Sequence, residues 1–236
     1  MTAEQRSQEP TERPEGSALA SPSRRRLVRG VAGSAGVLLS VHAKTALGAG
    51  VCKSPSAMMS GNTSPRPGSG ITCSGGRSPG FWKVPQKFSY WAGAGAVPPT
   101  FNVTVNECAT GMQNLAVSNL LTQGTLLTNA GFTGAPAGVG LWAVMAFPNS
   151  YPGGQLMRHL SAAWLNAGYF TSAAEKYPLT KQQVIDMWNA TKSGGTYCPG
   201  SLTGCGTSGW SSTQVIAYIS GMYDINSGVE PDLCKP

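Results

Sequence analysis

Charged residues are scarce in this sequence: they make up 11% of its 236 residues, although the formal net charge is +7. Residues 1–49 have seven basic and four acidic residues (+3), and residues 50–236 have ten basic and six acidic residues (+4). The ten basic residues of the second part stand singly, without the cluster of Lys and Arg that nucleic-acid binding requires. We therefore expect no nucleic-acid partner.

Residues that bind metals are also few. The sequence has no Cys-x-x-Cys pair, and His159 is the one histidine after residue 49, so a zinc site is not expected. Residues 224–232 have the acidic character of a calcium loop. However, Gly228 stands at the fifth position, where such a loop needs an oxygen ligand. We expect no metal and no other cofactor.

The sequence shows no complete catalytic constellation. Gly76–Gly80 matches the G-x-S-x-G pattern of a hydrolase nucleophile elbow, but Pro79 follows the serine and has no N–H for an oxyanion hole. His159 has no carboxylate placed to orient it as a general base. We predict no catalytic residue. A glycan-acting enzyme remains the alternative, and its carboxylates would come from Glu107, Glu175, Asp186, Asp224, Glu230 and Asp232.

Aromatic residues, in contrast, are concentrated in residues 73–91. Two turn signals, Gly75-Gly76 and Pro79-Gly80, open this segment, and four large rings follow within eleven positions, with a fifth, Tyr90, beside the last of them. Rings of this size in a small domain usually fill the core. The other interpretation is a stacking platform for sugar rings, for which the candidate ligand-binding residues are Arg77, Trp82, Tyr90 and Trp91.

Periodic apolar residues predict helices in the second half of the chain. Residues 155–167 place Leu156, Leu160 and Trp164 on one face, with Gly168 as the stop signal. Thr180 and Ser211 each begin an [ST]-x-x-Q capping box, which predicts helices that start after them. A weaker pattern predicts a helix over 112–122. Residues 101–105 alternate as in a short strand, and the apolar run 141–147 fits a buried strand or a short helix.

These patterns predict a mainly α fold: a small helical domain with long Gly/Pro-rich loops, tied by disulfides, with at most a short strand pair. The polar residues 1–22 are expected to be a disordered tail. Residues 50–72, rich in Ser, Pro and Gly, are expected to be a linker, and residues 73–236 the domain.

Six cysteines follow residue 49, and an even number in an exported chain indicates disulfide bonds. Cys198 and Cys205 flank a short loop and are the best local pair. We favour Cys73–Cys234, which would join the ends of the domain, and this leaves Cys52–Cys108. The sequence alone keeps other pairings of these four cysteines open.

Residues 23–29, with Arg24, Arg25 and Arg26, resemble the twin-arginine export signal, a Ser-Arg-Arg pattern followed by apolar and basic residues. The apolar run behind it, 30–41, is shorter than the ~20 residues of a membrane-spanning helix. Small residues then suit a signal peptidase, so we interpret 23–49 as a cleaved signal peptide. This implies the Tat translocase as a partner, no stable membrane anchor, and a periplasmic or extracellular location.

Three further segments resemble a group of uncharacterised exported bacterial proteins, which share a GGR[ST]PG[FY]WK motif and an AAxLNA helix. In this chain the segments are 75–83 (GGRSPGFWK), 158–167 (RHLSAAWLNA) and 177–185 (YPLTKQQVI). Many members have Asn-His-Pro after the Trp-Lys, where this chain has Val84-Pro85-Gln86. The resemblance implies a secreted or surface module and carries over no catalytic residue.

We therefore expect an exported, disulfide-bonded structural or binding module without a catalytic site. Its partner would be a cell-wall or extracellular polysaccharide, or a protein.

Overall fold

The structure, a computed structural model, describes residues 53–59, 73–108, 111–172, 175–200, 205, 208–225 and 227. All of them belong to one compact unit, which spans Val41–Pro236. The predicted tail and signal peptide lie outside the described residues. Of the predicted linker, residues 53–59 are described, and they include a short helix, α3 (Pro55–Met59). The Tyr218 hydroxyl donates to the Lys53 carbonyl at 2.6 Å, which ties α3 to the domain.

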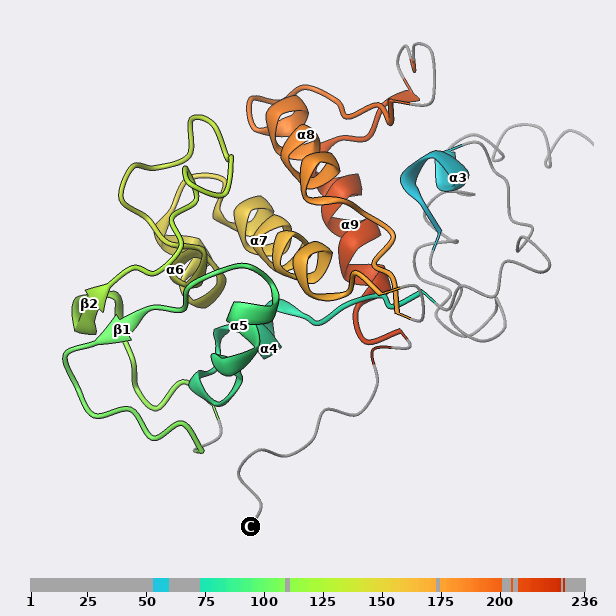
Figure 1. The fold of residues 1–236 in the computed structure, drawn as a ribbon. Coiled ribbons are helices and arrows are strands. Elements are labelled where there is room, and N and C mark those ends of the chain that lie inside the picture. The colour runs from blue at the N-terminus through green and yellow to red at the C-terminus, as the bar shows by residue number, and fades with distance from the viewer. Residues whose placement is uncertain are drawn as a thin grey trace, which may run out of the picture. The chain divides into compact units, whose positions relative to one another are not determined.

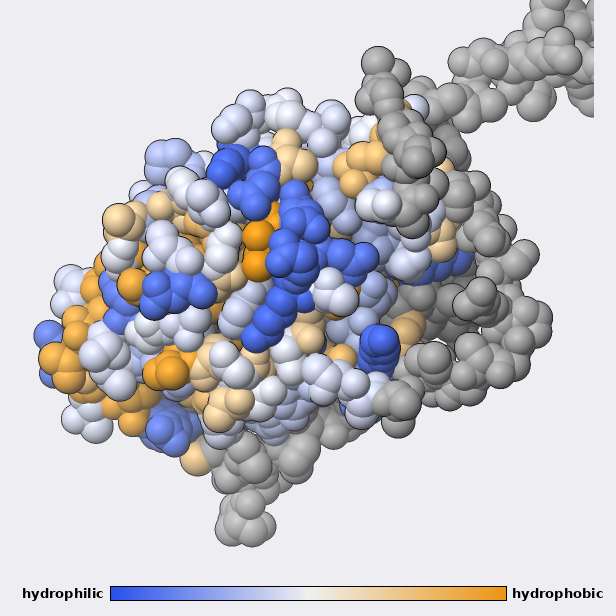
Figure 2. Space-filling view, turned by 45° about the horizontal axis from the view of Figure 1, so that its top comes forward, coloured by the Kyte–Doolittle hydropathy of each residue, from blue (hydrophilic) through white to orange (hydrophobic). Residues whose placement is uncertain are grey.

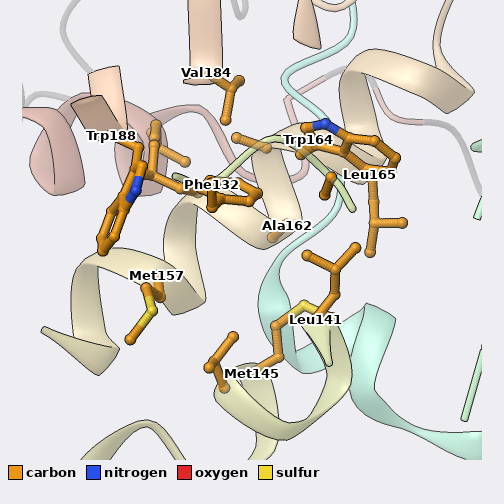
Figure 3. Packing of buried hydrophobic residues seen from close by; sticks show 14 of the residues in the cluster. Phe132, Leu141, Met145, Met157, Ala162, Trp164, Leu165, Val184 and Trp188 are labelled. Atoms are coloured by element: carbon orange, nitrogen blue, oxygen red, sulfur yellow. The ribbon is translucent and has the colours of Figure 1, made fainter. Parts of the chain in front are cut away.

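A central helix, α7 (Gly154–Tyr169), organises the domain. It contacts α6 (Leu141–Ala146), α8 (Lys181–Thr191) and α9 (Ser212–Met222), as Figure 1 shows with α7 in yellow between its neighbours. The predicted apolar face, with Leu156, Leu160 and Trp164, is buried. Met157, Ala162 and Leu165 are buried as well (Figure 3). Since helices pack on several sides of α7, its burial extends beyond one stripe.

The two capping boxes are confirmed. The Thr180 hydroxyl accepts from the Gln183 N–H at 3.1 Å, and the Gln183 side chain accepts from the Thr180 N–H at 2.9 Å. Ser211 and Gln214 make the same exchange at 3.4 and 2.8 Å. Each pair satisfies N–H groups that a helix start would leave without partners, so α8 and α9 begin where the sequence predicts.

Two local predictions are wrong. The predicted helix over 112–122 is absent, because Gln113 and Asn114 have φ of +48° and +61°. Instead, a 3-10 turn, η2 (Val117–Asn119), leads into β2 (Leu120–Thr122), and cross-strand pairing replaces helical hydrogen bonds. Gly168 does not stop α7. A Cβ at this position would overlap the Ala94 carbonyl oxygen, so the glycine permits close packing inside the helix.

The strand pair is short. β1 (Thr100–Phe101) pairs antiparallel with β2, so the predicted strand over 101–105 is mostly loop. The run 141–147 forms helix α6 and not a strand. The prediction of a helix-rich fold with one short strand pair is confirmed. None of the described helices is long and apolar enough to cross a membrane.

The aromatic segment folds into short helical turns. These are α4 (Pro79–Lys83), η1 (Pro85–Lys87) and α5 (Ser89–Gly93), and a further 3-10 turn, η3 (Pro148–Ser150), follows α6. α4 contacts both α6 and α7, and α5 contacts α7. The rings of this segment therefore reach the core beside α7.

The predicted disulfide Cys198–Cys205 is present, with 5.8 Å between the two Cα atoms. Cys73 and Cys108 are also disulfide-bonded. Their partners lie outside the described residues, as do Cys52 and Cys234, so the pairs Cys73–Cys234 and Cys52–Cys108 stay predictions.

Candidate functional site

The buried side chain of Asn166, on α7, joins the two segments that carry the sequence motifs. Its Oδ1 accepts from the Arg77 N–H at 2.8 Å and from the Trp82 indole N–H at 2.9 Å. Its Nδ2 donates to the Arg77 carbonyl at 2.9 Å. The backbone N–H and carbonyl of Arg77 belong to neither a strand nor a helix, so the Asn166 side chain supplies hydrogen bonds that these buried groups need. The Asn of the AAxLNA helix thus holds the GGRSPGFWK loop.

The first two glycines of this loop, Gly75 and Gly76, are required by close contacts. Gly76 has φ of +76°, and a Cβ there would lie 2.5 Å from the Asn166 side chain and 2.8 Å from the Tyr177 ring. A Cβ on Gly75 would overlap the Met222 carbonyl oxygen. The loop also bonds to the chain beyond α9, because the Asp224 N–H donates to the Gly76 carbonyl at 2.8 Å. The loop is therefore enclosed between α7 and the end of α9.

The polar residues of the same motif also have structural roles. The Ser78 hydroxyl accepts from the Phe81 N–H at 3.4 Å and caps α4, with Pro79 as its first residue. The Arg77 guanidinium donates to the Ser227 hydroxyl at 3.2 Å and lies 5.1 Å from the Phe81 ring centroid. Arg77 is buried, so its guanidinium faces the protein interior.

The proposed sugar platform is buried in this structure. Trp82 and Trp91 have no exposed surface, and the Trp91 indole N–H donates to the Trp82 carbonyl at 3.1 Å. Tyr90 is half-buried, with its ring centroid 5.8 Å from that of Tyr169. Its ring also lies 5.5 Å from the Lys87 ammonium. The rings therefore fill the core, and the indole faces are not available for stacking on a sugar.

His159 is paired with a phenol and not with a carboxylate. Its Nδ1 lies 2.9 Å from the Tyr223 hydroxyl, and the two rings stack. Burial, with a contribution from the Arg158 charge, lowers the pKa of His159 to about 4. The imidazole is therefore neutral at pH 7. Burial also raises the pKa of Tyr223 well above its usual value, so the phenol keeps its proton.

The acidic residues are spread over the described part of the chain, where no group of three His, Cys, Asp or Glu side chains is placed to hold a metal. Asp186 lines an open hollow of about 570 Å³ between α3, α8 and the Cys198 loop. Burial is the main cause that raises the pKa of Tyr197, and the charge of Asp186 raises this pKa further. Glu230 and Asp232 lie outside the described residues, as does most of the segment considered as a calcium loop.

A second open hollow, of about 630 Å³, lies beside the strand pair. Its lining contains hydroxyl, amide and aliphatic groups but no charged side chain and no ring: Val97, Thr122, Gln123, Gly124, Thr125, Leu126 and Asn129. The Val97 N–H donates to the Thr125 hydroxyl at 2.8 Å, which fixes one wall of the hollow against the other.

The hollow lies in a long segment that is almost free of charge. Glu107 is the one charged residue between Lys87 and Arg158. The large hydrophobic side chains with the greatest exposure come from this segment: Leu121 is 70% exposed, Val97 63%, Val103 43% and Val117 37%. Hydrophobic residues gather at the left of Figure 2, the side on which Figure 1 places β1 and β2. We call Val97, Val103, Val117 and Leu121 the neutral patch.

The side chains of two lysines bind backbone carbonyls of the segment 88–157, at residues that do not line the hollow. Lys181 donates to the Ala94 carbonyl at 2.8 Å and lies over the Trp164 ring, and Lys192 donates to the Thr133 carbonyl at 2.6 Å. Both ammonium groups are therefore engaged with the protein. The sequence analysis did not predict the neutral patch, although the scarcity of charge from 88 to 157, where Glu107 is the one charged residue, could have indicated it.

No protein-family model, curated protein or solved structure matches this chain.

Proposed function

We propose that this protein is exported through the twin-arginine route and acts in the periplasm or outside the cell as a disulfide-bonded binding or structural module. Its contact surface is the neutral patch with the adjoining hollow. The observation that carries the proposal is the exposure of Leu121 and Val97 in a segment nearly free of charge. Exposed aliphatic groups concentrated in one place are typical of interaction surfaces.

Two further observations support this function. The Cys198–Cys205 bond, with bonded Cys73 and Cys108, fits an oxidising compartment. The residues that suggested chemistry have structural partners instead: Ser78 caps α4, and His159 is paired with Tyr223. The motif resemblance to exported proteins points in the same direction.

The binding experiment uses protein recovered from the periplasm or medium. It measures retention by cell-wall fractions, exopolysaccharide fractions and immobilised copies of the protein itself. We expect one of these to retain the wild type and to release Leu121→Lys. A matched control, Ser193→Lys, adds the same charge at an exposed turn after α8. Equal behaviour of the two variants would contradict the assignment of the contact surface.

Export is tested separately. Replacing Arg24, Arg25 and Arg26 by Lys should leave the precursor in the cytoplasm, as detected by fractionation and immunoblotting. Normal export of this variant would remove the twin-arginine assignment.

A glycan-acting enzyme is the second candidate, and the position of Asp186 in a hollow favours it. Glycoside hydrolysis generally needs two carboxyl groups about 5–9.5 Å apart, and Asp186 is the one acid in the described lining. Release of reducing sugar from polysaccharide by the wild type, but not by Asp186→Asn, would establish this alternative.

A further inference from the structure

We propose that the partner at the neutral patch is a second copy of this chain, joined along the free edge of β2. This inference rests on the proposed function, because it names the occupant of the same contact surface.

The edge of β2 is the first reason. The sheet consists of β1 and β2 only, in the part of the chain that the structure describes, so the side of β2 opposite β1 pairs with no strand there. Proteins usually protect such an edge with charged side chains or proline. Here the middle residue of β2, Leu121, is aliphatic and 70% exposed, and the whole of β2 lacks charge. An unprotected edge of this kind favours pairing with another strand.

Symmetry makes the same strand a suitable partner. Two antiparallel copies of β2 can be related by a two-fold axis, which places each Leu121 near its counterpart. Such an isologous contact needs one surface that is complementary to itself. The neutral patch is aliphatic, and the adjoining hollow adds hydroxyl and amide groups, so the surface meets this condition, whereas a surface with a charge of one sign does not.

The charge of the chain selects this face for self-association. The chain carries +7, and residues 50–236 carry +4 from ten basic and six acidic residues, so copies repel each other in general. Contact through the segment between Lys87 and Arg158 brings together residues among which Glu107 is the one charged side chain, and Lys181 and Lys192, which reach this segment, bind its backbone carbonyls away from the hollow. A contact at this face therefore brings few charged side chains of the two copies together.

A glycan fits the patch less well. Sugar rings are commonly held against aromatic side chains, and the lining of the adjoining hollow has none. The exposed side chains of the neutral patch are Val and Leu, which gain most from contact with other apolar groups. The composition of the surface thus favours a protein partner over a neutral polysaccharide.

Sedimentation equilibrium of the exported protein tests the inference over a range from about 1 µM to 1 mM. We expect a monomer–dimer equilibrium, with a dissociation constant at least ~10-fold larger for Leu121→Lys and for Val97→Lys than for the wild type. Ser193→Lys should associate as the wild type does. Because the contact lacks charge pairs, raising the salt concentration should preserve or strengthen the dimer.

Circular dichroism and thermal melts check that the variants fold. If Leu121→Lys does not fold, Leu121→Thr, with its small β-branched side chain, is used in its place. A wild type that stays monomeric to 1 mM overturns the inference, as does equal weakening by Ser193→Lys. Binding to a polysaccharide fraction by a monomer, lost in Leu121→Lys, would also overturn it while leaving the proposed contact surface in place. A wild type that neither self-associates nor binds any of the fractions would instead contradict the proposed function itself.

Discussion

Asn166 holds the backbone of Arg77 from both sides: Oδ1 accepts from its N–H at 2.8 Å, and Nδ2 donates to its carbonyl at 2.9 Å. One side-chain amide thus replaces the two hydrogen bonds that a neighbouring strand would provide. The same Oδ1 accepts from the Trp82 indole N–H, so the loop and the first turn of the aromatic segment depend on one residue.

Replacing Asn166 by Ala should destabilise the protein by roughly 3 kcal/mol. The change leaves the Arg77 N–H, the Arg77 carbonyl and the Trp82 indole N–H buried without their partner, and each such group costs about 1–3 kcal/mol, with incomplete additivity. Urea unfolding measures the free energy. Asn189→Ala, at an exposed position of α8, is the control and should change stability by less than about 0.5 kcal/mol.

Gly76→Ala should be much more destabilising than Gly138→Ala. Both glycines have positive φ, +76° and +70°, so both substitutions incur the backbone cost of about 1–2 kcal/mol. Only at Gly76 would the new Cβ also press on Asn166 and Tyr177, since nothing lies within 4 Å of a Cβ at Gly138. Equal losses in thermal or chemical unfolding would show that the close packing around Gly76 has no energetic consequence.

The helix caps give a third prediction. Thr180→Ala and Ser211→Ala should each cost about 0.5–2 kcal/mol, because each removes the acceptor for a backbone N–H at a helix start. The conservative exchanges Thr180→Ser and Ser211→Thr retain a hydroxyl and should cost distinctly less. Chemical unfolding of the four variants makes the comparison, and losses that do not depend on the hydroxyl would assign the effect to packing.

The His159–Tyr223 pair makes stability depend on pH. The pKa of His159 is about 4 in the folded protein and near 6.5 in the unfolded chain, so between these values the unfolded chain binds more protons. The contribution is therefore complete above pH 6.5 and is lost as the pH falls toward 4, by roughly 2 kcal/mol after allowance for partial solvent exposure of the ring.

Unfolding at pH 7, 5 and 4 in wild type and in His159→Phe measures this effect. Phenylalanine can still stack on Tyr223 but does not titrate, so the stability of this variant should fall less over the same range. The titratable groups around the pair are Tyr177, Arg158 and Asp224. All three are present in both proteins, so the difference between their pH profiles isolates the imidazole. Parallel pH profiles would refute this role of His159.

The cysteines give the last prediction. Protein recovered from the periplasm or medium should have no free thiol, and peptide mapping should recover the Cys198–Cys205 pair. Reduction should lower the melting temperature by many degrees, since a native disulfide typically contributes about 2–4 kcal/mol. The same map decides between Cys73–Cys234 and another partner for Cys73. Six reactive thiols would contradict the expectation of an oxidised, exported protein.

Local interactions explain which features were predictable from the sequence. The starts of α8 and α9 follow from Thr180 and Ser211, because a capping box is completed within four residues and needs no distant partner. The Cys198–Cys205 bond closes a short loop and was predictable for the same reason. The interpretation of residues 23–49 as an export signal also depends on local pattern alone, and it stays a prediction because these residues lie outside the described part of the chain.

Tertiary packing accounts for the rest. Gly168 is a stop signal locally, yet it lies inside α7 because Ala94 approaches there and leaves no room for a side chain. Leu120 lies in the segment predicted as a helix over 112–122, but β1 offers it a partner from 19 positions away in the chain, since Phe101 pairs with it. The role of Asn166 and the burial of Trp82 depend on contacts between residues about 80–90 positions apart, and no local pattern encodes such contacts.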